Sequence, residues 1–252
     1  MEKLCFGVDV GGTTIKMGLF TTEGKLVDKW EIVTRKEDNG SHIPDDITLS
    51  INNKIQEKNI DRSNVSGIGI GVPGPVKEDG TVLKCVNLGW GIINISQILH
   101  EKTGFNIKAG NDANVAALGE MWQGGGKGYK NLVMITLGTG VGGGIILNEN
   151  ILTGVNGAAG EIGHMPVVYD ETETCGCGKK GCLEQVASAT GIVKEAKKIL
   201  ASTDEPSSLK NMENISAKNI FDEAKKGDKL ACEAVDRLCT YLGIASAHIA
   251  CV

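Results

Sequence analysis

Short apolar runs separated by glycine turns open the chain. The runs are Leu4–Val10, Ile15–Phe20 and Leu26–Val33, and the connections between them are Gly11–Gly12 and Thr22–Gly24. Runs of this length with such short connections are typical of neighbouring antiparallel strands. The pattern therefore predicts a three-stranded meander at the start of the protein.

Farther along, helical and strand spacings of apolar residues alternate. Ile47, Ile51 and Ile55 recur every four residues and predict a buried helix face within residues 44–60. A buried strand is expected at Val65–Val72, followed by the loop 73–75, and such loops at strand ends are where open α/β sheets bind ligands. The other predicted elements are a helix from Ser96 as N-cap to Gly104, a strand at Phe105–Ala109, a helix at Val115–Trp122, strands at Asn131–Leu137 and Ile145–Leu147, a surface loop at Ser202–Asn214, and helices that begin at Ser188, Ser216 and Asp228.

The first glycine turn carries candidate phosphate ligands. Consecutive glycines and threonines can direct backbone N–H groups and hydroxyls at a phosphate, and a nearby lysine adds positive charge. An aspartate at the end of the first run is placed to hold Mg²⁺ through water. An ordinary hairpin turn would show the same residues, so this stretch alone leaves both interpretations open. The candidate cofactor-binding residues are Asp9, Gly11, Gly12, Thr13, Thr14 and Lys16.

A second glycine turn repeats this plan of strand, turn and strand. It leads into a strand instead of a helix, which disfavours a dinucleotide-binding Rossmann motif. Two such turns predict a duplicated fold that holds phosphates from both sides. We expect an N-terminal α/β domain at residues 1–112 and a larger α/β domain at residues 113–252. The candidate residues of the second turn are Gly138, Thr139, Gly140 and Gly142.

Asp112 falls where a predicted strand meets a predicted helix. The positive end of the helix dipole favours an ionised carboxylate there. Aspartate is also a common N-cap, which requires no catalytic role. Asn111 and Asn114 lie beside it, and this cluster of polar side chains at a strand end favours a functional site.

His164, Cys175, Cys177 and Cys182 offer one imidazole and three thiols within a short span. This donor set is typical of a closed, structural zinc site. We expect Gly176, Gly178 and Gly181 to provide the tight turns that bring the sulfurs together. The zinc would fix two carboxylates near one point, those of Glu161 and Glu184. A zinc knuckle that only staples a long loop and a redox Cys-x-Cys are the alternatives, and the histidine disfavours the second.

Composition narrows the class of protein. The chain has 252 residues and a formal net charge of −5, and no basic stripe indicates nucleic acid as a partner. Of the eight cysteines, five lie outside the predicted zinc cluster in apolar surroundings, which predicts buried thiols in a reduced cytoplasmic protein. No signal peptide is expected because Asp9 interrupts the first apolar run. The longest apolar stretch, Leu132–Leu147, is broken by glycines, so no membrane span is predicted. The five cysteines are Cys5, Cys85, Cys232, Cys239 and Cys251.

Taken together, these segments resemble the ROK family of sugar kinases, most closely its glucokinase branch. The resemblance covers nearly the whole chain, and its motifs occur in the family's order. They are Asp9–Thr13, Gly71–Gly74, Asn87–Trp90, Asn111–Asn114, Gly138–Gly142 and the zinc cluster. The resemblance implies an actin-like ATPase (ribonuclease H-like) fold of two α/β domains, with sugar and nucleotide in the cleft between them.

The same resemblance implies roles for individual residues. Asp112 would be the catalytic base that faces the 6-hydroxyl of a hexose, and the two glycine turns would hold the phosphates of ATP with Mg²⁺. His164 would bind structural Zn²⁺ by one ring nitrogen and the sugar by the other. A homo-oligomer, dimer or tetramer, is expected because members of the family often form one. The residues implied in sugar binding are Gly74, Asn87, Asn111, Asp112, Glu161, His164 and Glu184.

The chain departs from the family pattern after the helix that begins at Asp228. Full-length relatives continue with a strand and a Gly-Gly-Gly turn that grips the adenosine, so we expect a truncated C-terminal part and impaired kinase activity. A sugar-responsive repressor is one alternative, disfavoured because such members carry a helix-turn-helix ahead of the first strand. An actin-like chaperone is another, disfavoured by the zinc loop. Among sugars glucose leads, ahead of N-acetylmannosamine, N-acetylglucosamine and fructose.

Overall fold

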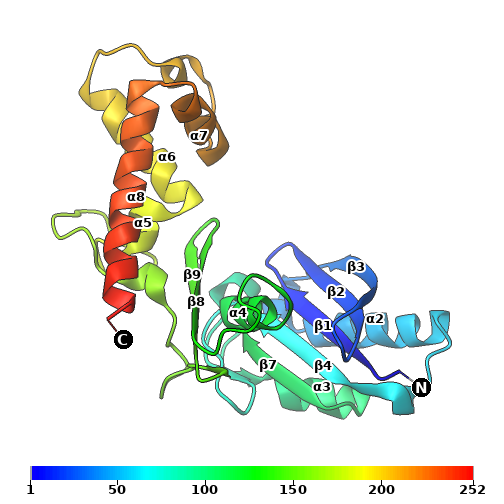
Figure 1. Ribbon diagram of the computed structural model, residues 1–252. Coiled ribbons are helices and arrows are strands. Elements are labelled where there is room, and N and C mark those ends of the chain that lie inside the picture. Colours follow the sequence, from blue (N-terminus) through cyan, green and yellow to red (C-terminus); the bar gives the residue numbers. More distant parts are fainter. Residues whose placement is uncertain (1, 252) are drawn as a thin grey trace. The chain divides into compact units, whose positions relative to one another are not determined.

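The computed structural model describes residues 2–251, which form two compact units (Figure 1). Unit 1 comprises residues 2–133 with Gly144–Gly160, and unit 2 comprises Met134–Gly143 with residues 161–251. The first unit thus extends beyond the boundary expected after Asp112. The physical reason is that the helix that begins there, α4 (Asp112–Gln123), packs on two strands of the unit 1 sheet, β4 and β7.

A five-stranded sheet in the order β3-β2-β1-β4-β7 forms the centre of unit 1. The predicted meander is confirmed, since β2 pairs antiparallel with both β1 and β3. β4 and β7 continue the sheet parallel to β1. The strands are β1 (Leu4–Val10), β2 (Thr14–Thr21), β3 (Leu26–Val33), β4 (Val65–Val72) and β7 (Ile107–Asn111).

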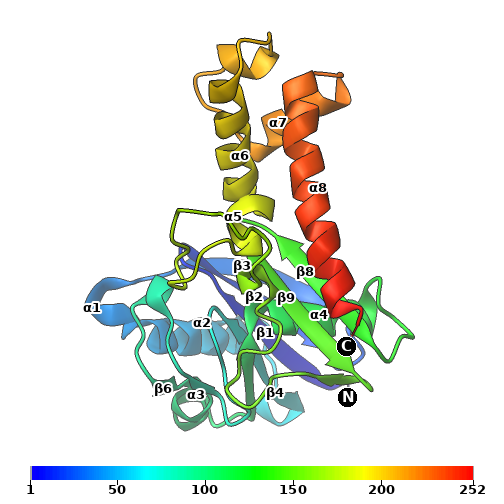
Figure 2. The same cartoon turned by 90° about the vertical axis from the view of Figure 1, so that its left-hand side faces the viewer.

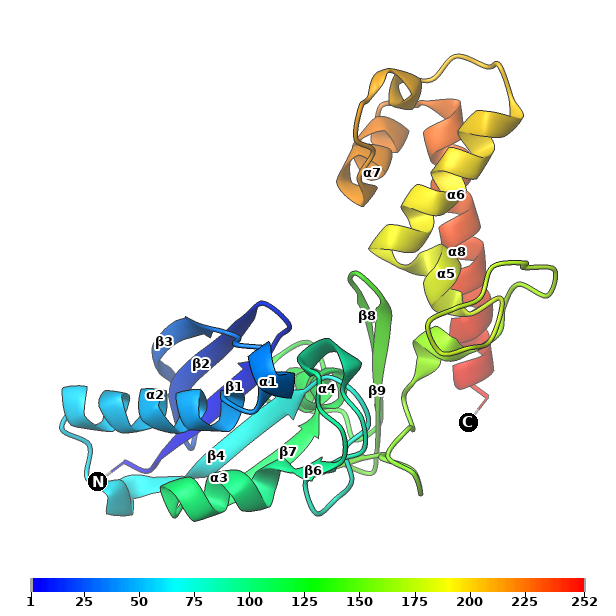
Figure 3. The same cartoon turned by 180° about the vertical axis from the view of Figure 1, so that it is seen from behind.

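Two helices cover one face of this sheet, as Figure 3 shows from behind. They are α2 (Ile43–Glu57) and α3 (Ile95–Thr103). The predicted four-residue repeat of isoleucines in α2 is buried against Ile68 and Ile70 of β4, which confirms the expected helix face. The short elements between them are α1 (Glu37–Gly40), β5 (Thr81–Val82), β6 (Ile93–Asn94) and the 3₁₀ turns Arg62–Asn64 and Val86–Leu88.

Strand β4 presents different side chains to its two faces. Ile68 and Ile70 enter the core, whereas Gly69 and Gly71 alternate with them on the opposite face. A Cβ built on Gly71 would lie 3.6 Å from the Cα of Asp112, so α4 approaches the bare backbone of the strand. The glycine face therefore determines how closely the start of α4 can sit to the sheet.

Unit 2 consists mainly of helices around a separate apolar core (Figure 2). The predicted helix starts are confirmed, since Ser188, Ser216 and Asp228 each accept a backbone hydrogen bond as N-caps. The expected loop at Ser202–Asn214 contains a 3₁₀ turn, Ser208–Asn211, because the buried side chain of Leu209 anchors it. The helices are α5 (Leu183–Ala187), α6 (Ala189–Ser202), α7 (Ala217–Lys225), α8 (Lys229–Ile249) and the 3₁₀ turn Ile162–His164.

A separate three-stranded sheet has the strand order β10-β9-β8. Its strands contain residues that belong to unit 1 and residues that belong to unit 2. Its strands are β8 (Leu132–Leu137), β9 (Val141–Leu147) and β10 (Asn150–Ile151). The second glycine turn connects β8 to β9, as expected for a turn between two strands.

Three expectations differ from the structure. The N-cap of α3 is Asn94, not Ser96, because the Asn94 side chain accepts the Gln97 N–H. Asn111, not Asp112, caps α4. Of the five scattered thiols only Cys85 is buried, and Cys239 and Cys251 are exposed.

In residues 2–251, no helix is both long and apolar enough to cross a membrane.

Candidate active site

Unit 1 holds the first glycine turn between β1 and β2. The Gly11 N–H donates to the carbonyl oxygen of Thr14 at 3.0 Å and closes the turn. Two further hydrogen bonds arrive from Thr34, whose hydroxyl donates to the Gly11 oxygen at 2.7 Å and whose N–H donates to the Thr13 oxygen at 3.0 Å. The turn is thus fixed through its carbonyl groups.

Asp9 and Lys16 occupy paired positions on β1 and β2, one pair farther from the turn than Val10 and Ile15. On its other side Asp9 pairs with Gly71 of β4. The opposite charges of the two side chains therefore flank the first turn at the end of the sheet.

Asp112 is the first residue of α4, and its carboxylate accepts the Ala113 N–H at 2.8 Å. Its pKa is raised above the ordinary value for an aspartate, mainly because surrounding protein desolvates the carboxylate and also because Asp9 contributes a nearby negative charge. The hydrogen bond from Ala113 opposes this shift. Asp112 still contacts solvent, so it combines a raised pKa with access for a ligand.

Asn111 connects the start of α4 to the loop after β4. Its Oδ1 accepts the Asn114 N–H at 3.2 Å, and its Nδ2 donates to the Gly74 oxygen at 3.2 Å. Gly74 has a φ of 93°, and a Cβ there would lie 2.5 Å from the Lys84 oxygen, so this position requires glycine. Asn114 is buried, and its side-chain oxygen has no hydrogen-bond partner within residues 2–251.

Asn87 lies exposed in the 3₁₀ turn Val86–Leu88. Reciprocal backbone hydrogen bonds between Cys85 and Trp90, both 3.0 Å, close this segment. A Cβ built on Gly12 would lie 4.0 Å from the backbone carbonyl oxygen of Asn87, which places this segment beside the first glycine turn. Burial, and to a smaller extent the negative charge of Asp112, raise the pKa of the Cys85 thiol. Unit 1 therefore brings its predicted site residues to one end of its sheet.

Unit 2 holds the second glycine turn against α6. The Gly138 N–H donates to the Gly140 oxygen at 2.9 Å. The Ala189 N–H donates to the Gly138 oxygen at 2.8 Å, and the Thr190 hydroxyl donates to the Thr139 oxygen at 2.8 Å. Gly142 lies just beyond, in β9. The start of α6 thus binds the carbonyl side of this turn.

Glu184 contacts the same turn from α5. Its Oε2 accepts the Val141 N–H at 3.1 Å. A Cβ on Gly140 would lie only 2.0 Å from that oxygen, so the contact depends on glycine at this position. Two residues that the sequence assigned to different ligands, a sugar and a phosphate, are neighbours in unit 2.

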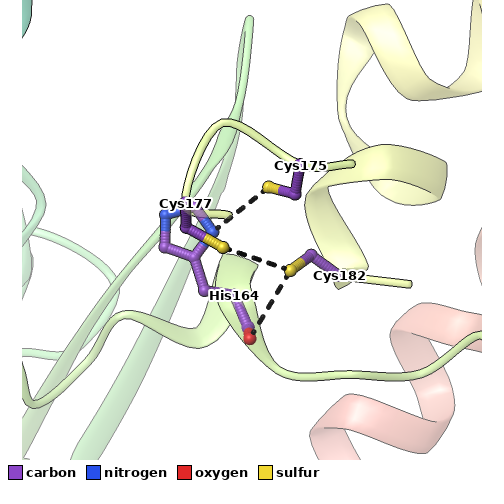
Figure 4. Close-up of side chains that lie close together, drawn as sticks. All are labelled: His164, Cys175, Cys177 and Cys182. Atoms are coloured by element: carbon purple, nitrogen blue, oxygen red, sulfur yellow. Dashed lines mark hydrogen bonds between the residues drawn. The ribbon is translucent and has the colours of Figure 1, made fainter. Parts of the chain in front are cut away.

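The predicted metal ligands converge in unit 2, as Figure 4 shows. One donor atom from each of His164, Cys175, Cys177 and Cys182 lies within 4.8 Å of the others. Cys175 Sγ is 3.7 Å from His164 Nδ1, and Cys177 Sγ is 3.6 Å from Cys182 Sγ. Zinc–sulfur bonds of about 2.3 Å in a tetrahedron require sulfur atoms roughly this far apart, so the cluster fits Zn²⁺.

Glycines shape the zinc loop at two of the three expected positions. Gly178 and Gly181 have φ values of 87° and 71°, in the left-handed region. A Cβ on Gly181 would also lie 1.7 Å from the Val168 oxygen. Gly176 has neither a positive φ nor a close neighbour, so its expected role in the turn is not needed.

The two sugar-site candidates beside the zinc cluster are tied to it locally. Glu161 immediately precedes the 3₁₀ turn that carries His164, and its carbonyl oxygen accepts the His164 N–H at 3.1 Å. Glu184 Oε1 lies 3.9 Å from Cys175 Sγ. With Nδ1 of His164 directed at Cys175, the Nε2 atom on the other side of the ring stays available for a second partner.

Two residues that bind the glycine turns, one in each unit, had no signal in the sequence. Thr34 and Thr190 lie far along the chain from the turns that they bind, and hydroxyl hydrogen bonds to distant carbonyls follow no spacing rule. Only the tertiary structure brings them to the glycine turns.

Comparison with known proteins identifies the family. A profile described as the ROK family matches residues 5–252. A glucokinase from Halalkalibacterium halodurans is 46% identical over 248 residues, which cover 97% of this chain and 75% of the relative. A ROK family glucokinase from Streptomyces griseus, solved with glucose and AMPPNP, aligns with a TM-score of 0.76 and 33% identity over 98% of this chain and 79% of that one. A ROK family transcriptional regulator aligns with a TM-score of 0.87 and 29% identity over 99% of this chain and 62% of that one. The chain has the actin-like ATPase fold of these structures and belongs to the ROK family.

Proposed function

We propose that the protein is an ATP-dependent hexose kinase that transfers the γ-phosphate of ATP to the 6-hydroxyl of glucose. The observation that carries this proposal is Asp112, a solvent-accessible carboxylate with a raised pKa at the start of α4, beside Asp9 and Asn111. The relative named glucokinase and the structure solved with glucose and AMPPNP support glucose and ATP as the substrates.

In the proposed reaction, Asp112 accepts the proton of the sugar 6-hydroxyl. The sugar oxygen then forms a bond to the γ-phosphorus, the bond from that phosphorus to the β,γ-bridging oxygen breaks, and ADP leaves. Phosphoryl transfer of this kind depends on an oriented nucleophile and on stabilised phosphate charge, not on covalent work by the protein. A raised pKa makes the Asp112 carboxylate a stronger base toward the proton of the sugar hydroxyl.

The other candidate residues bind the two substrates in this proposal. Carboxylates, amides and an imidazole suit the several hydroxyls of a hexose, and buried groups left unpaired by a wrong sugar would give discrimination. The two glycine turns, Gly11–Thr14 and Gly138–Gly142, hold the phosphates, and bound Mg²⁺ would neutralise their charge. The residues assigned to the sugar are Gly74, Asn87, Asn111, Glu161, His164 and Glu184.

Structural Zn²⁺ is part of the proposal because the donor set and its spacing suit that ion. Its role would be to fix the loop that carries His164 and to leave Nε2 for the sugar. A ligand that serves the metal with one nitrogen and a substrate with the other couples sugar affinity to metal content.

A sugar-binding regulator of transcription is the second candidate, because a ROK family regulator aligns with this chain at the TM-score given above. Such a protein would bind the hexose without transferring phosphate. N-acetylmannosamine, N-acetylglucosamine and fructose are the alternative kinase substrates. A cytoplasmic homo-oligomer, dimer or tetramer, completes the proposal.

The test is a coupled assay of ADP release with a panel of these hexoses, on the protein and its Asp112→Asn variant. We expect turnover with glucose, and a loss of kcat by about 10²- to 10⁴-fold in the variant with glucose affinity retained. Asp61→Asn, at an exposed aspartate that caps the 3₁₀ turn Arg62–Asn64 before β4, is the matched control and should keep full activity. Glucose binding without turnover in the unmodified protein would favour the regulator, and full turnover in Asp112→Asn would remove the base.

The raised pKa of Asp112 also predicts a pH dependence and a stability effect. Activity should fall as the pH drops through this pKa, at a pH above the ordinary aspartate value of about 3.9. A carboxyl whose pKa is raised by folding destabilises the folded state when it is ionised. Asp112→Asn should therefore unfold at a higher temperature than the unmodified protein at pH 7, although it is less active. An unchanged or lower unfolding temperature would contradict this.

A further inference from the structure

The two glycine turns are supported in the same way, although they lie in different units. Each turn accepts one hydrogen bond from a threonine hydroxyl and one from a backbone N–H of the same supporting segment. In unit 1 the hydroxyl is that of Thr34, bound to the Gly11 oxygen at 2.7 Å. In unit 2 it is that of Thr190, bound to the Thr139 oxygen at 2.8 Å. The backbone donors are Thr34 itself and Ala189, the residue before Thr190.

Because the peptide group is planar, a hydrogen bond to a carbonyl also fixes the direction of the N–H group on the other side of the same peptide. In a trans peptide the carbonyl of one residue and the N–H of the next point in opposite directions. A hydroxyl that fixes the Gly11 carbonyl therefore aims the Gly12 N–H away from Thr34. The bond to the Thr139 carbonyl aims the Gly140 N–H away from Thr190 in the same way. Within residues 2–251 neither of these N–H groups donates a hydrogen bond to the protein.

The two threonines differ in their surroundings. Thr34 is buried, with 6% of its surface exposed. Thr190 is exposed, but its hydroxyl belongs to a chain of hydrogen bonds, since the Gly191 N–H donates to the Ser188 hydroxyl at 2.9 Å and that hydroxyl lies 3.0 Å from Thr190 Oγ1. The chain strengthens the hydrogen bond of Thr190, but this bond is exposed and competes with water. The bond of Thr34 is buried, so its loss would leave the Gly11 carbonyl without a partner. We therefore expect the larger effect at Thr34.

We propose that Thr34 and Thr190 are positioning residues that orient the N–H groups of Gly12 and Gly140 toward the phosphates of a bound nucleoside triphosphate. This inference rests on the proposed function only for the identity of the nucleotide. Neither threonine needs to touch the nucleotide, because each acts through the peptide group that it fixes.

The test uses valine, which keeps the shape of threonine and removes the hydroxyl, and serine, which restores it. Affinity for Mg²⁺–AMPPNP is measured by calorimetry without sugar for Thr34→Val, Thr190→Val, Thr34→Ser and Thr190→Ser. We expect each valine variant to raise Kd about threefold to tenfold, the effect of one lost hydrogen bond, with the larger change at Thr34. Both serine variants should bind within about twofold of the unmodified protein.

Two other threonines provide matched controls. Thr48 and Thr240 also donate their hydroxyls to backbone carbonyls at 2.8 Å, but within helices α2 and α8. Thr48→Val and Thr240→Val should leave the Kd for Mg²⁺–AMPPNP unchanged. Amide hydrogen exchange of residues 10–14 and 137–141 supplies a second readout, and should be faster only in the valine variant of the threonine that supports each turn.

The outcomes separate this inference from the proposed function. Unchanged affinity and exchange in Thr34→Val and Thr190→Val, equal losses in the two control variants, or an unmodified protein that does not bind Mg²⁺–AMPPNP would overturn the inference. Nucleotide binding that responds to both threonines, without phosphate transfer to any hexose of the panel, would leave the inference standing and refute the proposed kinase activity.

Discussion

The candidate residues of unit 1 follow strands of a hydrogen-bonded sheet, whereas those around His164 in unit 2 lie in a loop with little regular structure. Asp9, Gly74 and Asn111 each occupy or follow a strand whose neighbours bury a continuous apolar core. The residues from Glu161 to Cys182 contain one 3₁₀ turn and two isolated β-bridges, Pro166–Cys182 and Thr174–Lys180, and the four donor atoms converge among them. The comparison teaches that a buried sheet positions one set of polar side chains, whereas the other set lies beside donor atoms that are spaced for a metal cross-link.

Removal of a zinc ligand is the most direct way to break this comparison. Cys182→Ser should reduce bound zinc from about one equivalent to nearly none, and should weaken glucose binding about 10- to 100-fold because the loop that carries His164 loses its anchor. Metal content by mass spectrometry and glucose affinity by calorimetry measure both effects. Cys239→Ser, at an exposed thiol outside the cluster, is the control and should change neither. Full glucose affinity in a zinc-free Cys182→Ser protein would show that the loop does not need the metal.

A cavity in the core of unit 1 tests the other side of the comparison. Ile51 of α2 is fully buried, so Ile51→Ala should lower the free energy of unfolding of unit 1 by about 2–5 kcal/mol. The zinc content of the Ile51→Ala protein should stay at about one equivalent, because the zinc cluster lies in unit 2. Leu49→Ala is the control on the same helix, at a residue that is 61% exposed, and should change stability little. Loss of zinc in Ile51→Ala would show that the zinc cluster of unit 2 depends on the apolar core of unit 1.

A methyl group in the second turn sharpens the comparison within unit 2. Gly140→Ala forces Glu184 away from the Val141 N–H, because the new Cβ would lie 2.0 Å from Oε2. The loss of one hydrogen bond should lower stability by about 1 kcal/mol. A Cβ on Gly138 would meet no protein atom within 4 Å, so Gly138→Ala should unfold at the temperature of the unmodified protein. Thermal unfolding distinguishes the two, and equal midpoints would show that the Glu184 contact contributes nothing.

The smallest effect concerns the partly exposed ion pairs of Asp28 with Lys54 and Lys58 in unit 1. Hydrogen bonds from Lys58 and then Lys54 lower the pKa of Asp28 to about 2. Because its unfolded value is about 3.9, the pairs stabilise the folded state above that pH and the contribution is lost as the pH falls toward 2. Urea unfolding at pH 6 and pH 3 should therefore show a smaller difference between the unmodified protein and Asp28→Asn at the lower pH. A larger difference in the free energy of unfolding at pH 3 than at pH 6 would contradict this prediction.

Local patterns in the sequence predicted most of the elements. The isoleucine repeat of α2, the meander β1–β3 and the N-caps Ser188 and Asp228 depend on neighbours close in the chain, and all are confirmed. Asn111 and Asp112 are adjacent and equally suited to cap a helix, so the sequence could not tell which one does. The zinc cluster was predictable because four donors of the right kind lie within 19 residues.

Other features depend on contacts that no local pattern encodes. The extent of unit 1 follows from the packing of α4 on β4 and β7, and the exposure of Cys239 and Cys251 follows from the way α8 meets its neighbours. The supports of the two glycine turns come from residues 20 or more positions away. Such contacts become visible only when the chain is folded.

The bare face of β4 has a consequence for attempts to alter this protein. Because the Cα of Asp112 sits 3.6 Å from where a side chain on Gly71 would begin, an alanine there would just fit and anything larger would displace the start of α4. Repositioning the carboxylate by changing this strand would therefore shift a whole helix. In the proposed kinase, substitutions at the exposed residue Asn87 would be the more direct way to change the acceptor sugar, because position 74 requires glycine and its carbonyl oxygen binds Asn111.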